Sequence, residues 1–275
     1  MPGSLRSRPG CKAAGVDALC DDVTAEHVDL DCLVSSGSLA DLDRPTPAPG
    51  WSVGDQISHL WYFDQQALLA LTDPDAFRAS TEQLLATVSG GEDPSVAAGR
   101  AIGPAELLER WRADRQALVS AARTVDPKAR VPWYGPAMSA RSFVTARLME
   151  TWAHGQDVVD SLGAERRPTA RLRHVAHIGV GARAFSYVTN GRQVPDADVF
   201  VRLDAPDGDE WTWGDPNAPD RVDGPALDFC LLVTQRRHRS DTAVRATGPA
   251  ADEWLDIAQA FAGPPGPGRS PGAFS

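Results

Sequence analysis

Apolar residues recur along the first 165 residues at the three- and four-residue spacing of amphipathic helices. The helices expected from this spacing cover residues 18–37, 52–73, 104–125 and about 140–162. The intervening segments 89–103 and 126–139 are rich in glycine and proline and are predicted to be loops. Four helices joined by irregular connections predict a helix bundle.

Two of these helices carry end signals. Ser52 is suited to the N-cap of the second helix, and Asp55, three positions later, gives an acidic variant of the capping box. The fourth helix is expected to end at Gly163, because glycine is favoured just after the last helical turn.

The pattern changes after residue 165, where a fifth helix is expected over 170–190. β-Branched and aromatic residues then predict short strands, with two further helices after them. The strands are expected near 198–204, 210–214 and 220–222, the helices at 225–239 and 251–263, and a candidate strand at 242–247. The chain is thus predicted to be mainly α, and α+β overall, with a bundle followed by a smaller α+β module.

Composition bears on whether the protein spans a membrane or is secreted. Hydrophobic residues make up 42% of the 275 positions, and no apolar run approaches the roughly 18 residues needed to cross a bilayer. Residues 1–15 include basic side chains without an apolar segment behind them, so they are predicted to be a disordered extension rather than a signal peptide. The glycine- and proline-rich tail 264–275 is also expected to be disordered. We expect a cytoplasmic protein with no membrane partner.

The net charge argues against a nucleic-acid-binding protein, and the cysteine spacing argues against a disulfide framework or a cysteine zinc site. A formal net charge of −10 argues against a nucleic-acid partner, since such binding needs a basic face. The four cysteines show no CxxC spacing and are expected to be reduced.

Glu150 and His154 are the first candidates for chemistry. They are four positions apart, so in a helix they project from one face and could bind one divalent metal ion. The alternative is a solvated polar pair, but apolar neighbours such as Trp152 argue against full exposure. His59, in the middle of the second helix, is the candidate third ligand; the alternative is a core histidine bonded to a carbonyl or to Asp55.

Together, two motifs resemble a known family. "TPAPGWSVGDQISHLWYFD" followed some ninety residues later by "RLMETWAHGQDVVDSLG" is similar to the DinB-type metalloproteins. The likeness is strongest to the branch that contains the mycothiol-dependent maleylpyruvate isomerases, and within it to a group of uncharacterised metal-binding proteins. It continues through "RHVAHIGVGARAFSY", "WTWG" and "GPALDFCLLVTQRRHR", and so covers nearly the whole chain after the first fifteen residues.

This resemblance implies a domain plan: a DinB-like four-helix bundle followed by a smaller SCP2-like α+β module. The expected parts are a disordered extension at 1–15, the metal-binding bundle at 16–165, the C-terminal module at 166–263 and the disordered tail at 264–275.

The resemblance also implies that His59, Glu150 and His154 hold the metal. Two imidazoles and one carboxylate leave at least one coordination position open, as in catalytic sites. The set suits zinc, and nickel, iron or manganese accept similar ligands. In the isomerase a thiolate adds to an activated double bond, so mycothiol and a small electrophilic substrate are the implied partners.

Four further residues have proposed roles. Asp157 could orient a ligand or accept a proton, or be a solvated carboxylate; Arg147 could bind substrate or pair with Glu150. The segment "LDFCLLVTQRRHR" resembles the one that brings an arginine to the isomerase active site. It places Arg236, or the adjacent Arg237, at the substrate, although glutamine replaces the family's glycine before Arg236.

His174 and His177 are expected to have packing or surface roles rather than to bind metal. Two other functions remain open. One is a thiol-independent, metal-dependent hydrolase, lyase or cyclase of a small metabolite. The other is a non-catalytic protein in which metal stabilises the bundle, with Asp157 or Gln156 as a fourth ligand. The chain is expected to be a monomer or a homodimer.

Overall fold

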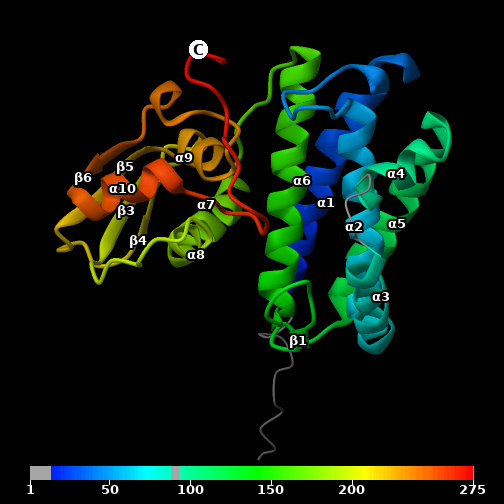
Figure 1. Cartoon of the computed structure of the whole chain (residues 1–275), viewed down its shortest axis with the longest axis horizontal. Coiled ribbons are helices and arrows are strands. Elements are labelled where there is room, and N and C mark those ends of the chain that lie inside the picture. The colour runs from blue at the N-terminus through cyan, green and yellow to red at the C-terminus, as the bar shows by residue number, and fades with distance from the viewer. Residues whose placement is uncertain (1–13, 88–92, 275) are drawn as a thin grey trace, which may run out of the picture.

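The computed structural model describes residues 14–87 and 93–274. Its first half is a helix bundle, seen on the right of Figure 1. The four long helices are α1 (Ala14–Ser35), α2 (Val53–Thr72), α5 (Pro104–Thr124) and α6 (Ala140–Leu162). Ser52 caps α2 in a capping box with Asp55, and Gly163 ends α6 with a positive φ of 62°, both as predicted.

Short elements complete the bundle. They are the 3₁₀ helix η1 (Leu39–Asp43), α3 (Pro74–Thr87), α4 (Pro94–Arg100), and the two-stranded sheet of β1 (Arg130–Val131) and β2 (Met138–Ser139). The prediction of a continuous loop over 89–103 was wrong for α4, which Asp93 caps and Pro94 begins.

Helix α4 lies close against α2 because Gly99 has no side chain. A Cβ there would lie 2.3 Å from Ser58 Oγ. The Gly99 amide instead donates to that oxygen at 2.8 Å, and Ser58 Oγ donates to the Ser95 carbonyl. This contact brings the start of α4 beside the middle of α2, next to His59.

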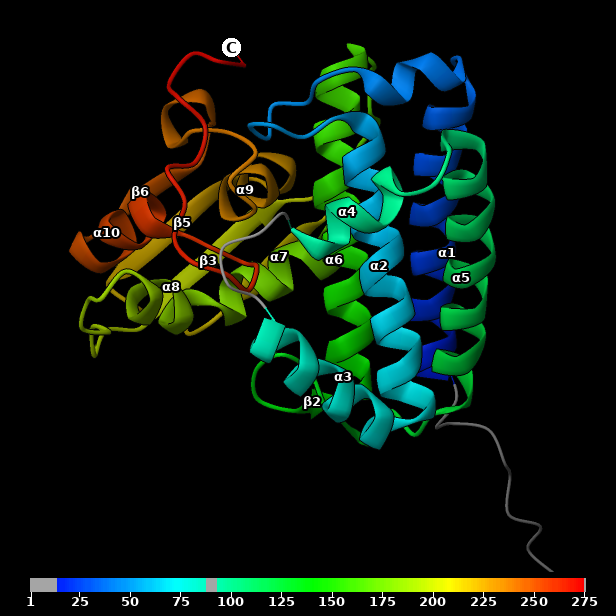
Figure 2. The ribbon, with the colours of Figure 1, turned by 45° about the vertical axis from the view of Figure 1, so that its right-hand side comes forward.

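The C-terminal module packs helices on a small mixed sheet (Figures 1 and 2). Its elements are α7 (Leu172–Gly181), α8 (Arg183–Thr189), β3 (Val199–Asp204), β4 (Glu210–Trp213), β5 (Asp220–Pro225), α9 (Ala226–Val233), the 3₁₀ helix η2 (Arg239–Asp241), β6 (Arg245–Thr247) and α10 (Pro249–Ile257). The strand order is β4-β3-β5-β6, with β3 and β5 parallel and the other pairs antiparallel. The predicted α+β fold is confirmed.

Three predicted helices differ from the observed ones. The last, expected at 251–263, is α10 and ends at Ile257. The fifth is interrupted at Ala182, giving α7 and α8. The helix predicted at 225–239 ends at Val233, because Gln235 adopts a positive φ of 58° and turns the chain. This turn leaves Arg236 and Arg237 on an irregular segment that faces the bundle.

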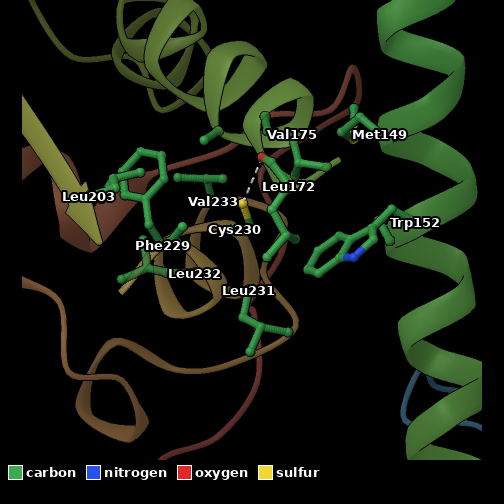
Figure 3. Packing of buried hydrophobic residues seen from close by; sticks show 14 of the residues in the cluster. Met149, Trp152, Leu172, Val175, Leu203, Phe229, Cys230, Leu231, Leu232 and Val233 are labelled. Atoms are coloured by element: carbon green, nitrogen blue, oxygen red, sulfur yellow. Dashed lines mark hydrogen bonds between the residues drawn. The ribbon is translucent and has the colours of Figure 1, made fainter. Parts of the chain in front are cut away.

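One apolar core joins the two halves. Met149 and Trp152 of α6 belong to the same buried cluster as Leu172 of α7 and Cys230 of α9 (Figure 3). The Cys230 thiol donates to the Leu172 carbonyl at 3.4 Å. Because α6 carries two of the candidate ligands, this shared core fixes the module relative to the candidate site.

The tail runs between the module and α6 (Figures 1 and 2). Arg269 binds Asp157 and the Pro47 carbonyl, and the Gly272 amide donates to Asp241. These contacts differ from the disorder predicted for 264–275. Of the predicted extension at 1–15, residues 1–13 lie outside the described residues, and α1 begins at Ala14.

Among the described helices, none has the length and apolarity that a membrane span requires.

Candidate metal centre

The bundle brings together one residue of α2 and two of α6. One ligand atom from each of His59, Glu150 and His154 lies within 4.8 Å of the other two. His154 Nε2 is 3.4 Å from Glu150 Oε2, and the two imidazole centroids are 4.4 Å apart. The side chains of His154 and Glu150 are 12% and 23% exposed.

A hydrogen-bond chain sets the tautomer of His59. Its Nδ1 is 2.9 Å from Ser95 Oγ, whose own proton is donated to Asp93 Oδ1 at 2.7 Å. The hydroxyl must therefore accept a hydrogen bond from Nδ1–H. This leaves Nε2 of the neutral ring with a free lone pair.

A second chain does the same for His154. Its Nδ1 is 2.6 Å from Gln56 Oε1, while Gln56 Nε2 donates to Thr46 Oγ1 at 3.0 Å. Thr46 in turn donates to the Trp51 carbonyl, so the amide orientation follows from the network. Gln56 accepts from Nδ1–H, and the neutral His154 ring also presents an unprotonated Nε2.

Two nitrogen lone pairs and a carboxylate therefore converge. The two lone pairs and the negative carboxylate repel one another unless a cation lies between them. That cation is either a proton on His154 or a metal ion. The donor set fits a divalent ion, with each imidazole oriented through its distal nitrogen as in known metal–histidine sites.

The electrostatics favour the protonation states that metal binding needs. When His154 carries the proton instead of a metal ion, burial together with the positive charges of His154, Arg147 and Arg236 holds the pKa of His59 well below its usual value. Burial alone would raise the pKa of Glu150, but the hydrogen bond and charge of His154, with Arg147 and Arg236, lower it. His59 is thus neutral and Glu150 ionised at neutral pH.

Aromatic rings border the cluster. Trp51 lies 5.1 Å from the His59 ring and stacks 6.0 Å from His154, and Phe63 lies 4.7 Å from His59. Trp133 and Tyr134 extend this surface away from the histidines. The rings supply an apolar contact surface beside the ligand set.

Arg147 does not form the predicted ion pair with Glu150. Its Nη2 lies 2.9 Å from Oδ1 of Asp64 on α2, and both side chains are buried. Burial raises the pKa of Asp64, and the Arg147 charge opposes that rise. Since α2 and α6 pack face to face, the arginine meets Asp64 across the interface, and it acts on the cluster through its charge.

Asp157 is buried, with 1% of its side chain exposed, so the alternative of a solvated carboxylate was wrong. It binds Arg236 at 3.0 Å and Arg269 at 2.5 Å. Arg236 also donates to the Thr234 carbonyl at 2.7 Å. The three side chains connect α6, the turn after α9 and the tail, and Asp157 is outside the three-residue cluster.

Arg237 has a different partner from Arg236. It binds Asp160 of α6 at 2.7 Å, and its guanidinium lies 4.3 Å from the ring centroid of Phe274. Gln156 also donates to Asp160, at 2.9 Å. Arg237 therefore holds the module against α6.

The other two candidate histidines lie elsewhere. His174 Nε2 is 2.9 Å from Asp22, and His177 accepts from the Trp213 indole at 3.4 Å.

The residues that orient the ligands were not predicted. Gln56, which accepts from His154, lies three positions before His59 on the same face of α2 and could have been found from helical spacing alone. Ser95 belongs to the unpredicted helix α4, and Arg269 to a segment expected to be disordered. Nothing in the local sequence indicates either contact.

Comparison with known proteins identifies relatives of this chain. Residues 23–159 match the family model described as mycothiol maleylpyruvate isomerase N-terminal domain. Two uncharacterised proteins, from two strains of Mycobacterium tuberculosis, are each 47% identical over 248 residues, which is 90% of this chain and 96% of theirs.

The fold is also similar to a solved one. The crystal structure of the mycothiol-dependent maleylpyruvate isomerase superposes with a TM-score of 0.56 at 16% identity, covering 84% of this chain and 92% of that one. A histidine-to-alanine variant of that isomerase gives the same values. With the family model and the 47% identical relatives in agreement, the chain belongs to the family of proteins with a mycothiol maleylpyruvate isomerase-like N-terminal domain.

Proposed function

We propose that the protein is an enzyme that binds a divalent metal ion through His59, Glu150 and His154 and acts on a low-molecular-weight thiol, mycothiol. The reaction is isomerisation of, or S-transfer to, a small electrophilic substrate. The observation that supports this most directly is the pair of hydrogen-bond chains that orient both imidazoles with Nε2 toward the carboxylate.

The metal would supply Lewis acidity, which lowers the pKa of a bound thiol enough to give a thiolate at neutral pH. Zinc suits this donor set, and nickel, iron or manganese are compatible with it. The three ligands leave room for such a partner, since no fourth acidic, histidine or cysteine ligand joins the cluster among the described residues.

The surrounding residues have separate roles in this proposal. The Trp51 and Phe63 rings bind the apolar part of the substrate and exclude water. Arg236 binds a substrate carboxylate: its charge reaches both His59 and Glu150, and its buried Nε–H has no hydrogen-bond partner among the described residues. Asp157 positions that guanidinium, and Arg237 holds the module in place.

The free thiols of Cys20, Cys32 and Cys230 fit the reducing cytoplasm, in which a mycothiol-dependent reaction would run.

The test has two parts. Metal analysis of purified protein should give about one divalent ion per chain, lost in His59→Ala and in His154→Ala. The metal-loaded protein is then supplied with mycothiol and either maleylpyruvate or monochlorobimane, a general electrophile. We expect turnover of one of them that needs both mycothiol and Glu150. Turnover that continues unchanged without thiol would contradict the proposal and favour a metal-dependent hydrolase, lyase or cyclase.

A further inference from the structure

A groove of about 790 Å³ lies between the bundle and the module, away from the candidate metal centre. Its walls come from α1, the first turns of α6, helix α7 and strand β4. Figure 1 shows the positions of these elements in the fold. Pockets that bind small molecules have volumes of roughly 300–1,000 Å³. None of the three candidate metal ligands lines this groove.

Two helices present a repeated polar face to the groove. Arg141 and Thr145 are four positions apart on α6, and Arg173 and His177 are four apart on α7, so each pair projects from one side of its helix. The small residue Gly181 continues the α7 face and leaves space between the walls. Polar side chains, including one arginine from each helix, therefore face the groove from both α6 and α7.

The groove is positively charged in an acidic protein. Most arginines in the described chain lie within ion-pair distance of a carboxylate, as Arg112 does with Asp31. Within the described residues, Arg141 and Arg173 form no such pair, although both are exposed and line the groove. The one acidic side chain in the described lining, Asp22, is bound to His174.

Trp213 provides a flat surface beside these charges. Its half-buried indole donates to His177 Nδ1 at 3.4 Å, so in the neutral His177 ring the proton lies on Nε2 as a further donor. The Arg173 guanidinium lies 5.9 Å from the ring centroid of Trp211, two positions earlier on the same strand. The tryptophans thus place an aromatic face and a guanidinium on the same wall.

We propose that this groove is a second ligand site, which binds a small aromatic carboxylate. The guanidiniums of Arg141 and Arg173 pair with the carboxylate, and the ring of the ligand packs on Trp213. The site is distinct from the metal centre: His154 is thirteen positions after Arg141 on α6, a distance of about 20 Å along a helix. The Trp213 surface is the reason that an aromatic carboxylate fits better than a bare anion.

The probe for this site is phthalate, which combines a benzene ring with two carboxylates. Calorimetric titration of the full chain should show phthalate binding that is weakened at least tenfold in Arg141→Gln and in Arg173→Gln, and weakened also in Trp213→Leu. Arg245→Gln is the matched control, since Arg245 is exposed, lies on β6 and is not a lining residue. Its binding should equal that of the wild type.

Three results would overturn the proposal. The first is the absence of phthalate binding at millimolar concentration, and the second is unchanged binding by the Arg141→Gln, Arg173→Gln double variant. The third is equal affinity for inorganic phosphate, which would show that the ring is not recognised.

The same titration of His59→Ala separates this site from the proposed metal function. We expect phthalate to bind this variant as it binds the wild type, whether or not the metal proposal holds. Loss of binding there would place phthalate at the metal centre and contradict a second site. Metal content should be the same in the groove variants as in the wild type.

Discussion

Replacement of Gln56 tests how the bundle prepares His154 for metal. Gln56 is fully buried, and its Oε1 accepts from His154 Nδ1 at 2.6 Å, at the short end for such a bond. In Gln56→Leu an apolar side chain replaces the amide at this buried position, so either Nδ1–H loses its acceptor or the proton moves to Nε2 and occupies the ligand position. An unsatisfied buried donor costs about 1–3 kcal/mol.

We therefore expect Gln56→Leu to weaken metal affinity about 10- to 100-fold, as found for groups that orient metal-bound histidines. The assay is competition for zinc with a chromogenic chelator at fixed pH. Gln56→Glu keeps an acceptor at the same position and should bind metal within a few-fold of the wild type or more tightly.

The matched control is Gln65→Leu, on the same helix, where the glutamine donates to Asp114 instead. Its metal affinity should not change. Wild-type affinity in Gln56→Leu, with the fold intact by circular dichroism, would refute the reasoning that this amide sets the His154 tautomer.

Three further outcomes are expected. Burial lowers the pKa of His27 to about 3, so as the pH falls below about 6.5 the unfolded chain takes up a proton that the folded chain does not, and the free energy of unfolding decreases. Urea unfolding of His27→Leu should show a decrease between pH 7.5 and 5 that is about 2 kcal/mol smaller than in the wild type. Asp64→Ala leaves Arg147 buried without its carboxylate and should lower the unfolding free energy by about 3–5 kcal/mol, whereas the Asp64→Leu, Arg147→Met double variant should recover most of it. Arg269→Gln should speed proteolytic removal of the tail without changing metal content, because Asp157 keeps its bond to Arg236; equal cleavage rates would show that the tail is held by other contacts.

Helical periodicity and capping predicted the long elements well because each of those helices buries a regular apolar stripe. Helix α4 was missed because it is short and rich in small residues, and its position depends on the approach of Gly99 to Ser58, which no local pattern encodes. The interruption at Ala182 separates α7, which packs against α9, from α8, which packs against α10.

In the candidate site, too, some features could be predicted from local sequence and others depend on tertiary contacts. The spacing of Glu150 and His154 could be read from the chain, because both lie on one helix. The partners of Arg147 and Asp157 could not, because Asp64 lies on α2 and Arg269 lies over a hundred positions after Asp157. Tertiary contacts bury these two aspartates and their arginine partners. A buried charge needs an opposite charge beside it, so the pairs form only where the fold brings the residues together.

We propose above that His59, Glu150 and His154 bind one metal ion through oriented side chains. Anomalous X-ray diffraction from metal-replete crystals measures this most directly. We expect a single peak bonded to Nε2 of both histidines and to a Glu150 oxygen at about 2.0–2.2 Å. A metal bonded elsewhere, or bonded through Nδ1 of either histidine, would contradict it.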